Sequence, residues 1–259
     1  MSDAWIRALV ALPFGLAIGS FMTVVTARVP AGESLLRPRS KCPRCGTTIR
    51  DRDNVPVLGW VLLRGTCHAC GERISPLYPA LELTTAILVA GAFYVYASLW
   101  VAFAIAALLA LMPAISAIDI RHRIIPNTIM YPALIAFPVY LVIARLAGAP
   151  VDLVRMAIGF AAYGGGLFVV AAISRGMGMG DVKLAALLGA VLGSLGLAYV
   201  GVAAGAAILL GGIGAIVALA ILRDRKAKIP FGPYLAAGAV VAAFWGRAIA
   251  DWYLRTLMG

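Results

Sequence analysis

Residues 83–118 read LTTAILVAGAFYVYASLWVAFAIAALLALMPAISAI and contain no Asp, Glu, Lys or Arg. One membrane-spanning helix needs about 20 apolar residues. The 36 residues of this run therefore predict two helices, joined by a turn near Tyr96–Trp100. Because the apolar residues are continuous and do not alternate with polar ones, the pattern favours helices over a β-barrel.

Further charge-free runs extend this pattern along the chain. They are residues 8–27, 124–144, 156–174, 184–222 and 229–246. The run 184–222 is again long enough for two helices, with a turn near Gly193–Gly196. We therefore expect an all-α membrane protein with eight transmembrane helices. Clustered glycines, at 164–166 and 211–212, predict that helices pack closely through small residues.

The overall composition argues against a water-soluble protein. Hydrophobic residues make up 63% of the 259 residues, and charged residues only 13%. Soluble domains carry about 25% charged residues, and the mean hydropathy of this chain is +0.96. Such an excess of apolar side chains exceeds what a soluble core can bury.

The basic residues are distributed unevenly between the two predicted sides of the membrane. With eight spans, one side receives the segments 28–78, 119–126, 175–183 and 223–228, which hold 17 of the 22 Lys and Arg residues. The positive-inside rule places that side in the cytoplasm and both termini outside. The net charge of +11 then faces anionic membrane lipid. No aromatic residues are interleaved with the basic ones, which argues against nucleic-acid binding.

This topology divides the chain into three parts. Residues 1–27 form the first transmembrane helix, and residues 28–78 form a cytosolic insertion between helices 1 and 2. Residues 79–259 form a membrane domain of seven helices. The insertion holds all four cysteines and most of the polar sequence.

The cysteines form two C-x-x-C-G motifs, Cys42–Cys45 and Cys67–Cys70, separated by 21 residues. Four thiolates at this spacing suit a tetrahedral zinc ion, and a shell closed by four protein ligands is typical of a structural site. Such a zinc would replace the hydrophobic core that a small insertion lacks. The alternative is two disulfides, which a reducing cytosol disfavours.

Two aspartates lie at predicted helix ends, where an ionisable residue is expensive and usually functional. Asp119 ends the third span and Asp181 begins the sixth. The topology brings both to the cytoplasmic side. Two adjacent carboxyl groups do not both ionise easily, so one can accept a proton from water while the other polarises a carbonyl. This predicts an aspartate dyad for hydrolysis.

Other interpretations of these residues remain open at this stage. Asp181 could simply favour a helix N-terminus, and Arg121 and Arg123 could merely neutralise Asp119. Gly178 and Gly180 predict a loop that an extended peptide could approach closely. Lys183 could orient a carboxylate or face lipid headgroups.

Together these motifs resemble the type IV prepilin peptidases, bacterial aspartic peptidases of the GxGD class. The resemblance covers roughly residues 14–240 and depends on the order of its motifs. These motifs are Gly19–Pro30, Arg39–Cys45, Arg64–Cys67, Ile74–Pro79 with Glu82, Ile118-Asp119, Ile125–Asn127, Gly178–Leu184 and Ile229–Pro233. Thr23, Gly59 and Thr66 depart from the residues common in that family.

The resemblance implies a peptidase of the bacterial inner membrane. It implies that Asp119 and Asp181 cut the basic leader from type IV prepilin and pseudopilin precursors at the cytoplasmic face, before the hydrophobic helix that stays in the membrane. It also implies methylation of the new N-terminus with S-adenosylmethionine. Gly65 and Glu82 are the candidate methyl-donor or substrate residues. Glu82 could bind the new amine or pair with a loop arginine.

Two functions of other classes compete with a peptidase. A transporter or proton relay would also use carboxylates within the membrane. A non-enzymatic assembly scaffold would use the cysteine insertion to dock a partner protein.

Overall fold

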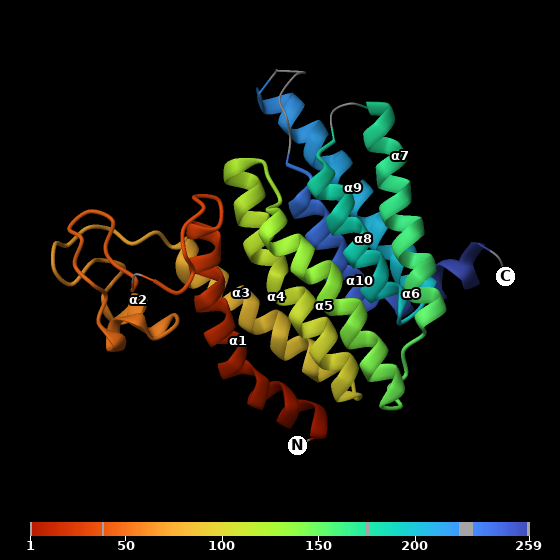
Figure 1. Ribbon diagram of the computed structural model, residues 1–259, viewed down its shortest axis with the longest axis horizontal. Coiled ribbons are helices and arrows are strands. Elements are labelled where there is room, and N and C mark those ends of the chain that lie inside the picture. The colour runs from red at the N-terminus through yellow and green to blue at the C-terminus, as the bar shows by residue number, and fades with distance from the viewer. Residues whose placement is uncertain (1, 38, 175–176, 223–229, 258–259) are drawn as a thin grey trace.

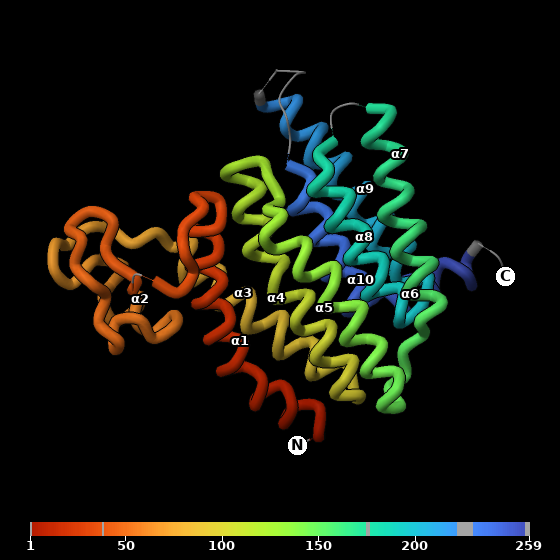
Figure 2. The backbone as a smooth tube through the Cα atoms, in the orientation of Figure 1, coloured from red at the N-terminus to blue at the C-terminus, as the bar shows by residue number. Residues whose placement is uncertain are grey.

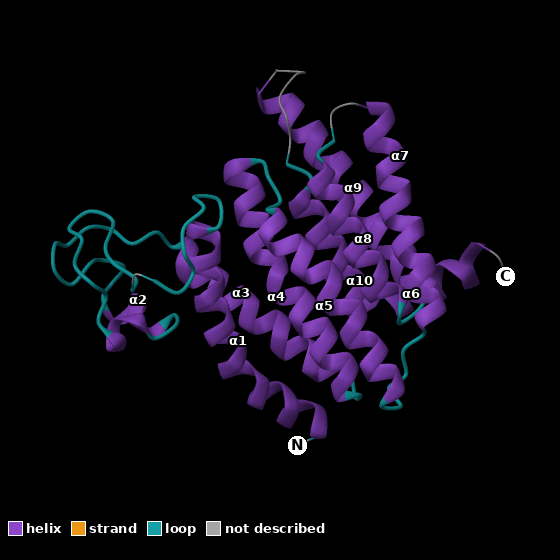
Figure 3. Cartoon of the chain, viewed as in Figure 1, coloured by secondary structure: helices purple, strands orange, loops and turns teal. Residues whose placement is uncertain are grey.

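Every regular element of the described chain is a helix (Figure 3). The computed structural model describes residues 2–37, 39–174, 177–222 and 230–257. Some residues used in the predictions lie outside these ranges. Arg175 and the basic segment 223–228 were counted in the predicted charge asymmetry, and Ile229 begins the last motif. The helices are α1 (Asp3–Arg28), η1 (Asp51–Asn54), α2 (Leu58–Leu62), α3 (Leu77–Val95), α4 (Leu99–His122), α5 (Asn127–Leu146), α6 (Leu153–Gly159), η2 (Phe160–Gly164), α7 (Gly165–Ser174), α8 (Met179–Gly193), α9 (Leu197–Leu222) and α10 (Gly232–Leu257).

Within the described ranges, seven helices are long and apolar enough to cross a membrane. They are α1, α3, α4, α5, the continuous α6–η2–α7 segment, α9 and α10. The two predicted turns are confirmed, because α3 ends at Val95 before α4 begins at Leu99, and α8 ends at Gly193 before α9 begins at Leu197. The chain is therefore a multi-pass membrane protein.

The remaining predicted span, the sixth in chain order, is the helix α8, which has only 15 residues. At a rise of 1.5 Å per residue it is roughly 22 Å long, shorter than a hydrocarbon core of about 30 Å. It lies inside the bundle (Figure 1), and every residue from Leu184 to Gly193 is buried. A helix that is apolar on all sides is usually buried by other helices, and α8 fits this rule.

The predicted close packing of helices at glycines is found at some positions and not at others. A Cβ on Gly159 would lie 2.2 Å from the carbonyl oxygen of Gly189 in α8. A Cβ on Gly164 would lie 2.6 Å from the Cβ of Ala186. The prediction is wrong for Gly165, Gly166 and Gly212, since a Cβ on each of these would meet nothing within 4 Å.

The cysteine-containing segment forms a separate module (residues 39–74) beside α1 and the start of α3 (Figure 2). α1 and α3 pack tightly beneath it, because a Cβ on Gly19 would lie 2.7 Å from the Cα of Glu82. The module is built from turns, η1 and α2, with two isolated β-bridges, Lys41–Thr48 and Thr66–Arg73.

Candidate active site and metal centre

Asp119 lies in the last turn of α4 and is only 5% exposed. Its Oδ2 accepts a hydrogen bond of 2.8 Å from the backbone N–H of Gly232, the first residue of α10. A Cβ on Gly232 would lie 2.7 Å from that same oxygen, so glycine is what allows the amide to come this close. The carboxylate therefore sits at the N-terminus of α10, where the helix dipole favours a negative charge.

Asp181 lies in the first turn of α8, whose N-cap is Gly178. Its backbone N–H donates to the carbonyl of Gly178 at 3.1 Å. Gly180 is needed for space, because a Cβ there would lie 2.8 Å from the Cβ of Ile125 in the loop between α4 and α5. Gly178 has an ordinary φ of −75°, a backbone angle that other residues also adopt.

The fold brings the two aspartates, 62 positions apart in sequence, to one end of the bundle, because Gly180 packs against Ile125 in the loop that follows α4. Each carboxylate lies at a helix N-terminus, Asp181 at that of α8 and Asp119 at that of α10. Among the described residues, neither Arg121 nor Arg123 forms an ion pair with Asp119, and both are exposed. Acid–base hydrolysis by two carboxyl groups needs one of them ionised and the other protonated.

Among the described residues, Lys183 forms no ion pair with Asp119 or Asp181. Its Nζ donates to Asn127 Oδ1 at 2.6 Å and to the Tyr131 hydroxyl at 3.0 Å. The same Nζ lies 4.4 Å from the centroid of the Tyr131 ring, a cation–π contact. Lys183 thus ties the start of α8 to the start of α5, which helps to fix the position of Asp181.

The two cysteine motifs have nearly the same backbone. In the first, Cys42 N–H donates to Thr47 and Gly46 N–H donates to Cys42 at 3.0 Å. In the second, Cys67 N–H donates to Glu72 and Gly71 N–H donates to Cys67 at 2.9 Å. Gly46 and Gly71 have φ values of +71° and +72°, a conformation that favours glycine, which explains the Gly after each motif.

The four sulfur atoms of Cys42, Cys45, Cys67 and Cys70 lie within 4.8 Å of one another. A tetrahedron with Zn–S bonds of about 2.3 Å has S···S edges of roughly 3.8 Å. The Cys42 and Cys70 sulfurs are 3.9 Å apart. The cluster fits a zinc ion held by four thiolates, and all four cysteines are free of disulfides in this structure.

The thiols of the cluster differ in acidity. Hydrogen bonds from the Thr47 hydroxyl and backbone lower the pKa of Cys45 to about 6. Backbone hydrogen bonds at Ala69 and Cys70 lower the pKa of Cys67. A backbone hydrogen bond at Glu72 acts in the same direction on Cys70, but desolvation and the other thiols outweigh it and raise its pKa to about 12. Crowded thiols do not all ionise together without a cation.

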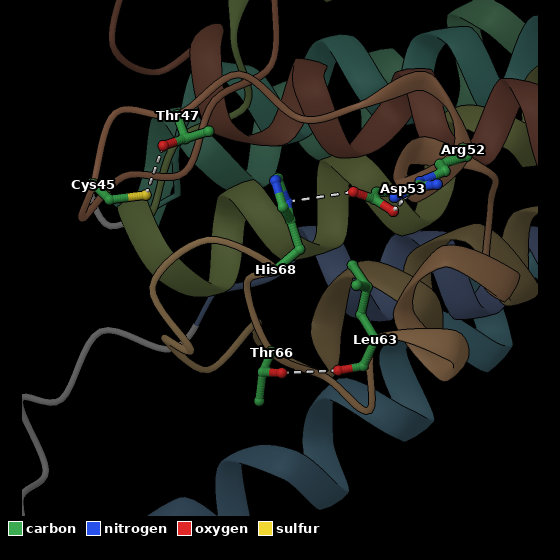
Figure 4. A network of polar contacts seen from close by, with 7 residues as sticks. All are labelled: Cys45, Thr47, Arg52, Asp53, Leu63, Thr66 and His68. Atoms are coloured by element: carbon green, nitrogen blue, oxygen red, sulfur yellow. Dashed lines mark hydrogen bonds and ion pairs between the residues drawn. The ribbon is translucent and has the colours of Figure 1, made fainter.

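His68, between the second pair of cysteines, points toward Asp53 of η1 (Figure 4). Its Nδ1 lies 3.3 Å from Asp53 Oδ2, and the two side chains are 18% and 11% exposed. This contact joins the second cysteine turn to η1. His68 therefore stabilises the module through its contact with Asp53.

Gly65 and Glu82, the candidate methyl-donor or substrate residues, both have structural contacts. Gly65 has a φ of +69°, and a Cβ there would lie 2.9 Å from the Trp60 ring. Glu82 is buried in α3 and accepts a 2.7 Å hydrogen bond from the backbone N–H of Val57. Among the described residues, these contacts form no cradle for S-adenosylmethionine. The contact of Glu82 instead docks the module on the bundle.

Two further residues at this site lie in motifs that the resemblance includes. Gly232, which binds Asp119, belongs to the Ile229–Pro233 motif, and Asn127, which binds Lys183, ends the Ile125–Asn127 motif. Both motifs were recognised by resemblance, but their contacts depend on which helix ends meet in space.

Comparisons with known proteins cover nearly the whole chain. Residues 14–96 match the family model described as "Bacterial Peptidase A24 N-terminal domain". Residues 106–222 match the model described as "Type IV leader peptidase family". No solved structure matches the chain at a significant level.

Relatives of this chain carry the name "Prepilin leader peptidase/N-methyltransferase". The Bacillus subtilis protein is 37% identical over 255 residues, which cover 95% of this chain and 97% of the relative. The Stutzerimonas stutzeri protein is 33% identical, with 95% and 93% covered. The Pseudomonas aeruginosa protein is 32% identical, with 93% and 91% covered. By this identity over almost its entire length, the chain belongs to the type IV leader peptidase family.

Proposed function

We propose that this protein cleaves the leader peptide from type IV prepilin and pseudopilin precursors, with Asp119 and Asp181 as its catalytic dyad. The observation that carries the proposal is the pair of aspartates, which two distant segments bring to one end of the bundle. Relatives named prepilin leader peptidase, similar over almost the entire chain, support the choice of substrate.

The chemistry of the dyad is that of an aspartic peptidase. The ionised carboxylate takes a proton from water, and the resulting hydroxide attacks the scissile carbonyl carbon. The protonated carboxyl donates to the carbonyl oxygen, which stabilises the tetrahedral intermediate. That intermediate collapses as the C–N bond breaks, the nitrogen takes a proton, and the leader leaves with a new carboxylate.

We propose that the dyad and the cysteine module face the cytoplasm of a bacterial inner membrane. The proposal follows from the 17 basic residues predicted on that side, against five on the other. α8 is then the sixth transmembrane element, enclosed by its neighbours and too short to reach both surfaces. In this proposal its N-terminus, with Asp181, faces the cytoplasmic side.

The four-cysteine cluster is proposed to bind one structural zinc ion per chain. Cys42, Cys45, Cys67 and Cys70 would hold it, and four thiolates close its coordination shell. The zinc would stabilise the turns of the module and take no part in peptide hydrolysis.

N-methylation of the new amino terminus, with S-adenosylmethionine as donor, is proposed as a second activity. It is supported by relatives that carry N-methyltransferase in their name, over 95% of this chain in one case.

Mass spectrometry of a prepilin incubated with the purified protein tests both activities. We expect the leader to be lost without the donor, and one methyl group to be gained only when S-adenosylmethionine is present. Cleavage in detergent, where no ion gradient exists, argues against a transporter. An unchanged precursor, with folded enzyme and a matched substrate, would favour the transporter or scaffold interpretations.

A further inference from the structure

A groove lies between the first half of α4 and the second half of α5. Its volume is about 710 Å³. The lining residues are all apolar or aromatic: Leu99, Trp100, Phe103, Ala104, Ala107, Ala136, Phe137 and Tyr140. The two helices lie side by side (Figure 1), so the groove opens on the lipid-facing surface of the bundle.

The walls of the groove suit a helix better than a polar ligand. Ala104, Ala107 and Ala136 are small, and small residues let helix backbones approach closely within a membrane. The only side-chain hydroxyl in the lining belongs to Tyr140, and it donates to the carbonyl of Trp100 at 3.0 Å. The lining is therefore predominantly apolar, with the Trp100 indole N–H as its one other side-chain donor.

The position of the groove relates it to the aspartate site. The groove occupies the N-terminal turns of α4, while Asp119 lies in the last turn of the same helix. α5 runs back beside α4 and begins at Asn127, the residue that binds Lys183. Both walls of the groove therefore lead along the bundle to the dyad.

We propose that this groove binds the hydrophobic helix of the substrate, the segment that follows the cleaved bond. The inference rests on the proposed peptidase function. A peptide cut beside Asp119 must continue across the membrane from that end of α4 toward the other. Ala107 lies about 12 residues from Asp119, or roughly 18 Å at 1.5 Å per residue, and Trp100 roughly 28 Å away.

These lengths fix a register for the bound helix. Substrate residues about 12 to 19 positions after the cut lie at the depth of the groove. A lipid acyl chain could fill an apolar groove, but it has no covalent link to the scissile bond and therefore no register. Binding through this remote helix helps to hold the scissile bond at the dyad, so it affects long substrates and spares short ones.

Filling the groove tests the proposal. We expect Ala107→Trp to lower kcat/KM for a full-length prepilin by roughly tenfold, because the added ring occupies the space of the bound helix. Cleavage of a short peptide that spans the cut but lacks the hydrophobic helix should be unchanged. Ala215→Trp, on the exposed face of α9, is the matched control and should alter neither rate.

The two possible failures are distinguishable. If the wild-type protein cleaves neither substrate, the peptidase function is wrong. If it cleaves both and Ala107→Trp changes neither rate, or slows both equally, only the groove is wrong.

A photocrosslinker tests the register directly, even if the short peptide is cleaved poorly. It is placed at position 107 or 103 of the full-length protein carrying Asp181→Asn, which keeps the precursor uncut. Position 107 should capture substrate residues about 12 after the cut, and position 103 residues about 16 after it. Capture of lipid alone, or of substrate without this order, would overturn the proposal.

Discussion

The aspartate end of the bundle and the cysteine module position their functional groups by opposite means. Asp119 and Asp181 are held by packed helices, and the helix that begins beside Asp181 is buried from Leu184 to Gly193. In the module, Cys42 is the only buried hydrophobic residue among the described positions. Packing fixes the carboxylates, whereas turns and hydrogen bonds place the thiols, and the proposed metal ion would secure them.

This difference predicts that the two regions fail separately. Loss of a carboxyl group should stop hydrolysis and leave the module intact. Loss of a thiol should loosen the module and leave the dyad assembled. Among the described residues, the hydrogen bond from the Val57 N–H to Glu82 joins the module to α3 of the bundle.

The largest effect is expected from removing one carboxyl group. Asp119→Asn and Asp181→Asn should each lower the rate of leader cleavage by roughly 10²–10⁴-fold or more, because neither amide can carry out the proton transfer. Zinc content and thermal unfolding should stay near wild type. Asp251→Asn, at an exposed position of α10, is the control. Wild-type cleavage by either folded dyad variant would contradict the mechanism.

The next largest effect is expected on the metal. Cys42→Ser should weaken zinc binding by more than about 100-fold, since even the loss of outer-shell partners costs 10–100-fold. The measurement is zinc per chain by mass spectrometry, with limited proteolysis of residues 39–74. Lys41→Ala, at the exposed neighbouring position, should leave both unchanged.

The rate of leader cleavage by Cys42→Ser tests whether the cysteine module and the aspartate site are independent. We expect cleavage to fall by about tenfold or less, because the metal shell is closed and takes no part in hydrolysis. A metal-free wild-type protein with two disulfides would contradict the zinc assignment. Complete loss of cleavage in a folded Cys42→Ser protein would show that the two regions are not separable.

A smaller effect is expected at the link between the regions. Glu82→Ala removes the acceptor of the Val57 N–H, and an unpaired buried amide costs about 1–3 kcal/mol. Hydrogen exchange at Val57 should accelerate, while exchange within α8 stays slow. Glu33→Ala, an exposed carboxylate, is the control. Unchanged exchange at Val57 would show that Glu82 does not dock the module.

The smallest effect is expected from Lys183. Lys183→Met removes its contacts with Asn127 and Tyr131, which lie at the surface, so about 0.5–1.5 kcal/mol is at stake. Cleavage should fall by tenfold or less. Lys183→Arg should recover part of that loss by keeping a donor and a cation. A loss as large as that of a dyad variant would assign Lys183 a direct catalytic role.

The sequence predicted the helices well, but not which neighbours each would have. α8 and α9 come from one charge-free run of 39 residues, 184–222, that extends through both. Yet α8 is buried by protein, while only 6% of the apolar window of α9 is buried. Protein and lipid are equally apolar surroundings, so hydropathy cannot separate an enclosed helix from a lipid-facing one.

The sequence predicted those parts of the candidate site whose residues lie close together in the chain. The four cysteines lie in two short motifs, and their clustering followed from spacing alone. The contact of Asp119 with Gly232 joins residues 113 positions apart, and it depends on how α4 meets α10. Similarly, Glu82 was a candidate ligand from its motif, and only the fold gives it a backbone partner.

The central claim is that Asp119 and Asp181 act as one proton-sharing pair, and the pH dependence of kcat/KM for leader cleavage tests it most directly. If the two carboxyl groups share one proton, kcat/KM should show a bell-shaped dependence on pH, because activity requires one carboxyl charged and the other neutral. Zinc per chain is measured at each pH to separate loss of metal from titration of the dyad. A profile with a single limb, at constant zinc and fold, would contradict the account.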